Sequence, residues 1–249
     1  MEETQNSKVG LYGKIPGHGD FVSRNLEDEF MVPWDQWLQN VISVSREQLE
    51  NLWLQTFLTS PIWRFAFEGG ACGAYPMTGV MIPSVDKVGR YFPFVLAAPI
   101  TNSPLHHLIN DEEWYNHAED ILLATLESDI KVDQVLEMTA AMPELSSAKL
   151  TESNAIQVHH SFDTPKHAKM VWSTSTAEFD SVKDALPGFF EVALNEFFSP
   201  YSLWWTNGSE QIDRSLLVCD GMPPLAGFAA MLDGNWDQWG WPRHQLIKY

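Results

Sequence analysis

The chain has 249 residues, of which 45% are hydrophobic and 19% charged, so it can bury a sizeable core and the composition is not that of a disordered protein. Fifteen basic and 33 acidic residues give a formal net charge of -18, which argues against nucleic-acid or anionic-membrane binding through a general basic surface. A basic partner, or solubility alone, is compatible with this charge.

The ends of the chain and its cysteines indicate the compartment. The first ten residues are polar and lack the apolar region of a secretory signal, and the apolar run 92–100 is about half as long as a membrane span. Cys72 and Cys219 lie far apart and have no metal-binding spacing, which is typical of two buried, reduced thiols. We therefore expect a cytoplasmic protein without a membrane-inserted segment.

The N-terminal quarter predicts a strand, a turn and two helices. Residues 8–14 are typical of a short strand that ends at Pro16, and a proline-glycine turn and a polar, partly helical segment, 20–30, follow. Pro33 suits a helix start, because apolar residues then recur at helical spacing. The S-x-x-Q pattern at 45–48 is a capping box that predicts the start of a second helix.

The rest of the chain mixes strands and helices without regular alternation. Three aromatic and β-branched runs within 61–100 predict a strand meander, and 143–154 is the best candidate for a linker or exposed loop. Helices are predicted at 111–128, 132–142, 177–198 (with a break at Pro187-Gly188) and within 223–232, and strands at 155–160, 168–174, 202–206 and 215–220. This order predicts one α+β domain over 1–249, a mainly antiparallel sheet flanked by helices, with a candidate subdivision near 143–154.

The first motif is GLYGKIPGHGDFVSR, residues 10–24. Its glycines and Lys14 suggest a phosphate-binding loop, but that loop needs Ser or Thr after the lysine, and here Ile15 and Pro16 follow. A structural interpretation is favoured: the glycines allow a tight turn after a strand, and Asp20 can pair with Arg24 one helical turn away.

The second motif is GVMIPSVDKVGRYFPF, residues 79–94, in which Asp86, Lys87 and Arg90 crowd a loop between two apolar runs. Gly89 suits a positive φ in that turn. The simpler interpretation, which we favour, is a solvated hairpin tip; the alternative is a loop that presents Lys87 and Arg90 for recognition.

The remaining patterns do not indicate a catalytic or metal-binding site. Trp204 and Trp205 point to opposite faces of a predicted strand, so one belongs to the core and the other either packs under a helix or joins a partner-binding surface. The histidine groups at 106–117 and 159–167 lack metal-ligand spacing, and no nucleophile motif occurs. We expect no metal, no cofactor and no catalytic residues.

Taken together, these stretches resemble the TagF (also called ImpM) family of proteins associated with bacterial type VI secretion. The resemblance rests on G-x-x-G-K-x-P-x-x-G-D-F-x-x-R, P-S-V-D-x-V-G-R-x-F-P, the stretches PWDQWL and PIWRFAF, and the later SLWWT and GMPPLAGFAAML. It covers 8–100 strongly and 200–232 more weakly, whereas 101–199 carries little of it.

The resemblance implies a function and a fold. TagF-like proteins are regarded as post-translational repressors of type VI secretion that oppose its threonine-phosphorylation pathway and are linked to a forkhead-associated scaffold protein. Some relatives carry a fused phosphatase domain, whose metal-binding aspartate pattern this chain does not show, so we expect no phosphatase activity. The implied fold is a longin- or profilin-type α+β arrangement.

The residues that match the family motifs are Lys14, Pro16, Gly19, Asp20, Arg24, Asp86, Gly89 and Arg90. We expect the two motif loops to lie together, with Asp20 paired to Arg24 or Arg90, as a structural clasp, a partner-docking surface that also involves Lys87, Trp204 and Trp205, or both. The alternatives to a binding regulator are a hydrolase-like enzyme using Asp20 and Asp86, and a structural component of the secretion apparatus.

Overall fold

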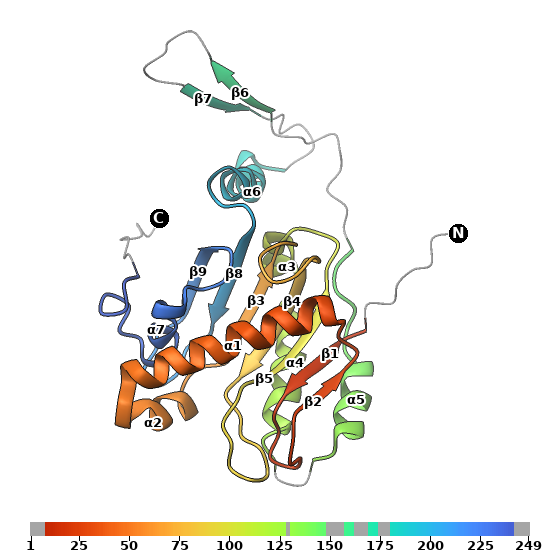
Figure 1. Cartoon of the computed structure of the whole chain (residues 1–249). Helices are drawn as coiled ribbons and strands as arrows, with labels where there is room; N and C mark the ends of the chain where they lie inside the picture. Colours follow the sequence, from red (N-terminus) through yellow and green to blue (C-terminus); the bar gives the residue numbers. More distant parts are fainter. Residues whose placement is uncertain (1–7, 128–129, 148–156, 162–168, 174–179, 242–249) are drawn as a thin grey trace.

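The computed structural model describes residues 8–127, 130–147, 157–161, 169–173 and 180–241. Its main element is a seven-stranded sheet in the order β2-β1-β5-β4-β3-β8-β9, in which every neighbouring pair is antiparallel (Figure 1). The strands are β1 (Gly10–Gly13), β2 (Val22–Arg24), β3 (Trp63–Phe67), β4 (Met77–Ile82), β5 (Phe94–Pro99), β8 (Tyr201–Thr206) and β9 (Ser215–Asp220). The predicted α+β fold with a mainly antiparallel sheet is confirmed.

Helices cover both faces of this sheet. They are α1 (Asp28–Leu49), α2 (Trp53–Leu58), α3 (Pro104–Asn110), α4 (Glu112–Ala124), α5 (Val132–Ala140), α6 (Leu186–Phe197) and α7 (Phe228–Asp233), with short 3₁₀ turns η1 (Glu50–Leu52), η3 (Val182–Ala185) and η4 (Leu225–Gly227). A separate hairpin, β6 (Gln157–Ser161) with β7 (Lys169–Ser173), lies apart from the sheet (Figure 1).

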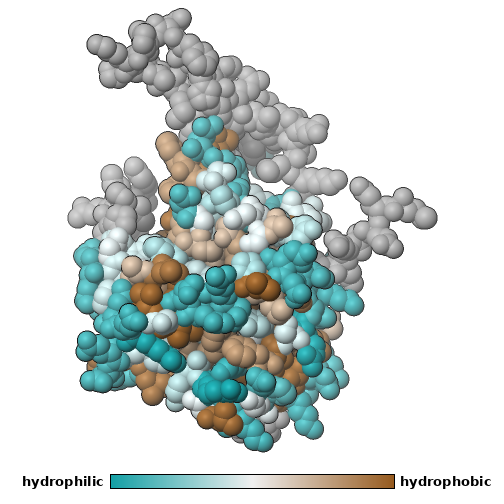
Figure 2. All heavy atoms as spheres, viewed as in Figure 1, coloured by the Kyte–Doolittle hydropathy of each residue, from teal (hydrophilic) through white to brown (hydrophobic). Residues whose placement is uncertain are grey.

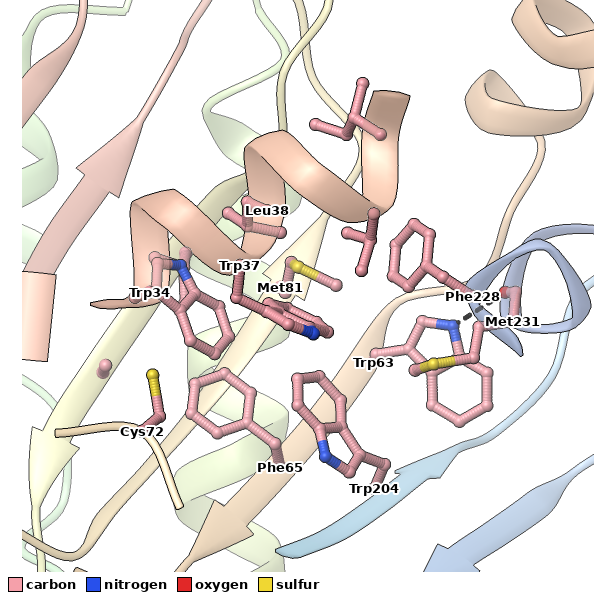
Figure 3. Packing of buried hydrophobic residues seen from close by; sticks show 14 of the residues in the cluster. Trp34, Trp37, Leu38, Trp63, Phe65, Cys72, Met81, Trp204, Phe228 and Met231 are labelled. Carbon is pink, nitrogen blue, oxygen red and sulfur yellow. Dashed lines mark hydrogen bonds between the residues drawn. The ribbon is translucent and has the colours of Figure 1, made fainter. Parts of the chain in front are cut away.

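One face of the sheet packs against α1, α2 and α7 through an aromatic core. Trp34 is fully buried, and its ring stacks parallel to that of Trp204 with centroids 6.0 Å apart and lies 4.8 Å from that of Phe65 (Figure 3). Because side chains alternate along a strand, the residues between these aromatics face α4 and α5. Two hydrophobic cores therefore lie on opposite faces of the sheet.

A buried cation, Arg64, lies on the far face of the sheet. Arg64 on β3 points at α4, where Nε donates to Glu119 at 2.6 Å, Nη1 to Glu112 at 3.0 Å and Nη2 to the Asn116 amide oxygen at 2.8 Å. A buried guanidinium needs such partners, since it keeps its charge and has five N–H donors to satisfy. These contacts fix α4 on the sheet.

Strands from the two ends of the chain belong to the same sheet. β8 pairs with β3 in the register Phe65 to Trp204, although these residues are far apart in sequence. The candidate linker contributes no helix or strand over 143–147, and its remainder, 148–154, lies outside the described residues.

Some local predictions are wrong. Segment 20–30 is partly helical, as predicted, because α1 begins at Asp28, but residues 22–24 form β2. Pro33 lies inside α1 instead of starting it. Ser45 caps no helix; it is buried within α1, where its hydroxyl donates to the Ile42 carbonyl and accepts from Trp53 Nε1 at 3.0 Å. A buried indole N–H needs a hydrogen-bond acceptor, and this explains a serine at position 45 better than helix capping does.

Candidate functional site

Two loops at one end of the sheet contain the motif residues. Loop 14–21 joins β1 to β2, and loop 83–93 joins β4 to β5. Because β1 and β5 are antiparallel neighbours, with Gly13 opposite Phe94, both loops leave the sheet at the same end (Figure 1). The backbone N–H of Lys87 donates to the carbonyl of His18 at 3.0 Å, so the two loops are hydrogen-bonded to each other, as expected.

Asp86 is the centre of this arrangement. Its side chain is 0% exposed, and Oδ2 accepts from Arg90 Nε at 2.6 Å and lies 3.1 Å from Lys14 Nζ. Oδ1 accepts from the backbone N–H groups of Val88 at 3.0 Å and Arg90 at 2.8 Å. Four donors thus surround one buried carboxylate, which is the number that satisfies its lone pairs.

The pKa of the Asp86 carboxyl lies well below its usual range. Burial acts in the opposite direction and is the largest single effect, but the donors from the Arg90 backbone and guanidinium, the Lys14 ammonium and the Val88 N–H together outweigh it. The carboxylate is therefore ionised at neutral pH and occupied by its partners.

Glycines shape both loops at positions where a side chain does not fit. A Cβ on Gly13, at φ +128°, would meet the Pro93 carbonyl oxygen at 2.1 Å, so only glycine allows β1 and loop 83–93 to approach this closely. Gly89 has φ +85° and closes the turn by donating to the Asp86 carbonyl at 3.0 Å. In the other loop, Pro16 and Gly17 form the predicted turn, closed by the His18 N–H on the Ile15 carbonyl at 3.1 Å.

The outer part of the arrangement is open to solvent. Arg90 Nη2 donates to the Gly19 carbonyl at 2.7 Å and lies 3.9 Å from Asp20, whose side chain is 80% exposed. Lys87 is also exposed. We use the name motif cluster for the residues that these contacts bring together: Lys14, Gly19, Asp20, Asp86, Lys87, Gly89 and Arg90.

Aromatic rings connect the motif cluster to α1. Lys14 Nζ lies 4.9 Å from the ring centroid of Phe21, which stacks on Tyr12 with centroids 5.7 Å apart. The Tyr12 hydroxyl donates to Asp35 of α1, and a cavity of about 290 Å³ lies there, lined by Tyr12, Met31, Val32, Asp35, Gln36 and Gln39. No sequence pattern indicated this cavity, because its lining comes from a strand and a helix that are separate in sequence.

Three residues expected at this site lie elsewhere. Arg24 lies on β2, where its guanidinium donates to the Ser23 carbonyl at 2.7 Å; the expected helical pair with Asp20 is wrong, because 20–24 is not a helix. Trp204 is fully buried in the aromatic core. Trp205 is half-buried against α4, with its ring 4.8 Å from that of Tyr115 in an edge-to-face contact. Both indoles are therefore packing residues in this structure.

The histidine pair at 106–107 fixes a loop. His107 is buried and hydrogen-bonded to Asp111, while Asp111 Oδ1 accepts from the Ser146 N–H at 2.8 Å and His106 Nε2 lies 2.7 Å from the Ser146 hydroxyl. The pKa of His106 is lowered by burial and by the neighbouring His107. The histidines at 159–160 and 167 belong to a region whose side chains lie outside the described residues. Among the described residues, no group of three or more His, Cys, Asp or Glu side chains is arranged to hold a metal ion.

The fold and its two N-terminal motif loops define an α+β protein with a polar cluster at one end of the sheet, and comparisons with known proteins agree with the fold. A family model described as the TagF N-terminal domain, type VI secretion system-associated, matches residues 10–142. The crystal structure of PA0076 from Pseudomonas aeruginosa PAO1 is similar, with a TM-score of 0.72, 32% sequence identity and coverage of 97% of each chain. No curated protein matches the chain.

The chain therefore belongs to the TagF family of proteins associated with the type VI secretion system. Within the described residues, no helix combines the length and apolar character needed to cross a membrane.

Proposed function

We propose that this chain represses assembly of the type VI secretion system after translation, in the cytoplasm, by binding its forkhead-associated scaffold protein, and that the motif cluster is the surface it uses. The observation that supports this proposal is the rigid presentation of exposed polar groups by a buried centre. Asp86 holds Arg90 in place, and Arg90 in turn holds loop 14–21 through the Gly19 carbonyl. A surface that is ordered before binding loses less conformational entropy on association.

The same geometry weighs against a hydrolase that uses Asp20 and Asp86. A general base must reach the proton that it removes, yet both oxygens of Asp86 are occupied and its side chain is 0% exposed. The cavity of about 290 Å³ is lined by neither aspartate. A structural component would be present at fixed stoichiometry in the assembled apparatus, whereas a regulator would be absent from it.

The test is size-exclusion chromatography of the purified chain mixed with its cognate forkhead-associated scaffold. The informative variant is Lys87→Glu, because Lys87 is exposed and only its backbone joins the loop-to-loop contact. Arg90→Glu is less informative, since it also places a second carboxylate beside Asp86. The matched control is Lys131→Glu, which makes the same charge change on an exposed residue next to α5.

We expect wild type and Lys131→Glu to co-elute with the scaffold and Lys87→Glu to elute separately while keeping its circular dichroism spectrum. Co-elution of all three proteins would remove the motif cluster from the interface. Absence of a complex with the wild-type protein would reject the scaffold as the partner and shift weight to the enzyme or to a structural component.

A further inference from the structure

Helix α6 carries both buried and exposed apolar residues. Leu194 is buried against Leu105, Tyr201 and Leu203. A second set is 42% to 73% exposed, and we call it the outer stripe: Val182, Leu186, Phe190 and Phe197. Leu186, Phe190 and Phe197 are separated by four and seven residues, which places them on one helix face, and Val182 precedes them by one turn in η3.

The docking of α6 on the protein is fixed by Leu194 and Glu191, and it leaves the outer stripe exposed beside the packed side of the helix. Glu191 accepts from the Ser103 hydroxyl at 2.7 Å and from the Tyr201 hydroxyl at 3.0 Å, and both bonds hold the helix on the body of the protein. A helix that is apolar around most of its circumference is normally buried on all sides. Large apolar side chains gathered on one exposed helix face mark an interaction surface more often than isolated ones do.

Charge indicates what kind of surface covers the outer stripe. Residues 180–197 contain four acidic side chains, Asp180, Asp184, Glu191 and Glu196, and one basic side chain, Lys183. Asp180, Asp184 and Glu196 are exposed beside the stripe, and Figure 2 shows hydrophobic and hydrophilic side chains next to each other over α6. A second copy of a chain with net charge -18 and an anionic membrane are both repelled by this border, whereas a basic protein surface is attracted.

The outer stripe lies at the opposite end of the sheet from the motif cluster. α6 leads into Tyr201 at the start of β8, and its neighbour Ser202 pairs with Phe67, which pairs with Met77 at the start of β4. The motif loops leave the other end of the sheet, after Ile82 of β4, as Figure 1 also shows. The outer stripe and the motif cluster are therefore separate surfaces at opposite ends of the sheet.

We propose that the outer stripe of α6 is a second docking site, which inserts into an apolar groove bordered by Lys and Arg on a protein other than the one bound at the motif cluster. An amphipathic helix in an apolar groove is a recurrent mode of recognition, read through residues three, four and seven apart. Opposite charges around the groove set the orientation and speed the encounter. Two docking sites at opposite ends would make the chain a bridge between two proteins; the bridging role rests on the proposed function of the motif cluster, whereas the docking site on α6 does not.

The first part of the test identifies the occupant. The photo-cross-linking residue p-benzoylphenylalanine replaces Phe190 in the full chain in the producing bacterium, and the cross-linked protein is identified by mass spectrometry. The same residue in place of Leu123, which is exposed on α4, is the matched control. We expect an adduct with one distinct protein from position 190 and none with that protein from position 123. An adduct of two copies of this chain, or no adduct, would overturn the proposal.

The second part measures binding of that purified protein by calorimetry. We expect Leu186→Ala/Phe190→Ala to weaken the affinity about tenfold or more, because it removes two apolar anchors, and Leu123→Ala to leave it unchanged. Alanine keeps the helix propensity, and unchanged circular dichroism shows that the variant is folded. Raising the salt concentration should also weaken binding of the wild type. An affinity that is indifferent either to the double substitution or to salt would overturn the proposal.

Discussion

The two ends of the sheet differ in which kinds of side chain they bury and which they expose. At the motif end, Asp86 and Lys14 are buried and both oxygens of Asp86 have donors, while Asp20, Lys87 and Arg90 stay exposed around them. At the α6 end, apolar side chains are turned outward and acidic residues lie beside them. The more conspicuous sequence motif therefore forms a clasp that also presents polar groups, while a helix without any motif exposes apolar residues.

A pattern of charged residues and glycines can therefore reflect what the backbone turn and the buried ion pair need, and it does not by itself identify a function. Lys14 looks like a phosphate ligand in the sequence, but in the structure it lies 3.1 Å from a buried carboxylate. An exposed binding surface, in contrast, does not need particular residues to keep the fold, so it is harder to recognise in the sequence.

The largest expected effect is at the motif end. Asp86→Ala leaves the buried Lys14 ammonium without its counter-ion, and breaking a buried pair in this way lowers the free energy of unfolding by about 3–5 kcal/mol. Urea denaturation followed by tryptophan fluorescence measures the change. Asp20→Ala is the control, because Asp20 is 80% exposed and 3.9 Å from Arg90, and should cost less than about 1 kcal/mol. Equal costs would mean that the clasp does not stabilise the fold.

The next effect compares a buried and an exposed leucine of α6 with the same substitution. Leu194→Ala removes a buried side chain and is expected to cost about 2–5 kcal/mol. Leu186→Ala removes an exposed one from the same helix and should stay within about 0.5 kcal/mol. Thermal unfolding of both variants gives the comparison. A large loss for Leu186→Ala would mean that the outer stripe is part of the folded core rather than a surface.

Most of the sheet could be predicted, because its strands are short aromatic and β-branched runs between glycines and prolines. The errors occur where tertiary contacts override local signals. Ser45 matches a cap pattern, but α1 continues past it, and its buried hydroxyl accepts from Trp53 Nε1. Pro33 is tolerated within α1 instead of starting it. α3 was not predicted, although Ser103 caps it by accepting from the His106 N–H at 3.2 Å.

The site was predicted in part. Asp86, Gly89 and Arg90 are close in sequence, so their turn could be inferred from the motif alone, and the resemblance to one family placed the two loops together. The partner of Asp20 was left between Arg24 and Arg90, and the structure selects Arg90 because β2 carries Arg24 away. The cavity beside Tyr12 could not be foreseen, since nothing in either segment records their contact.

A smaller effect concerns acid. The pKa of Asp86 is lower in the folded protein than its ordinary value of about 3.9, so the stabilisation is complete above that value and is lost as the pH falls toward the folded pKa. The difference in unfolding free energy between wild type and Asp86→Asn should stay constant, within measurement error, from pH 5 to 7. It should shrink by about 1 kcal/mol at pH 3. Asp111, whose pKa is also lowered, is present in both proteins and cancels. A gap that does not change with pH would contradict the assignment of Asp86 as the ionised centre.

A further effect of similar size tests the backbone of the motif cluster without changing its charges. Gly89 and Gly19 both have open space where a Cβ would stand, but only Gly89 has a positive φ, +85°. An L-residue in that region is strained, so Gly89→Ala should lower the free energy of unfolding by about 1–2 kcal/mol, while Gly19→Ala should change it by less than about 0.5 kcal/mol. Denaturant midpoints at constant slope measure both. Asp86 Oδ1 accepts from the N–H groups on either side of Gly89. A loss of stability for Gly89→Ala alone would therefore mean that the turn geometry, rather than loop packing, holds the carboxylate in place. Equal losses for the two glycines would instead mean that loop 14–21 is as constrained as loop 83–93.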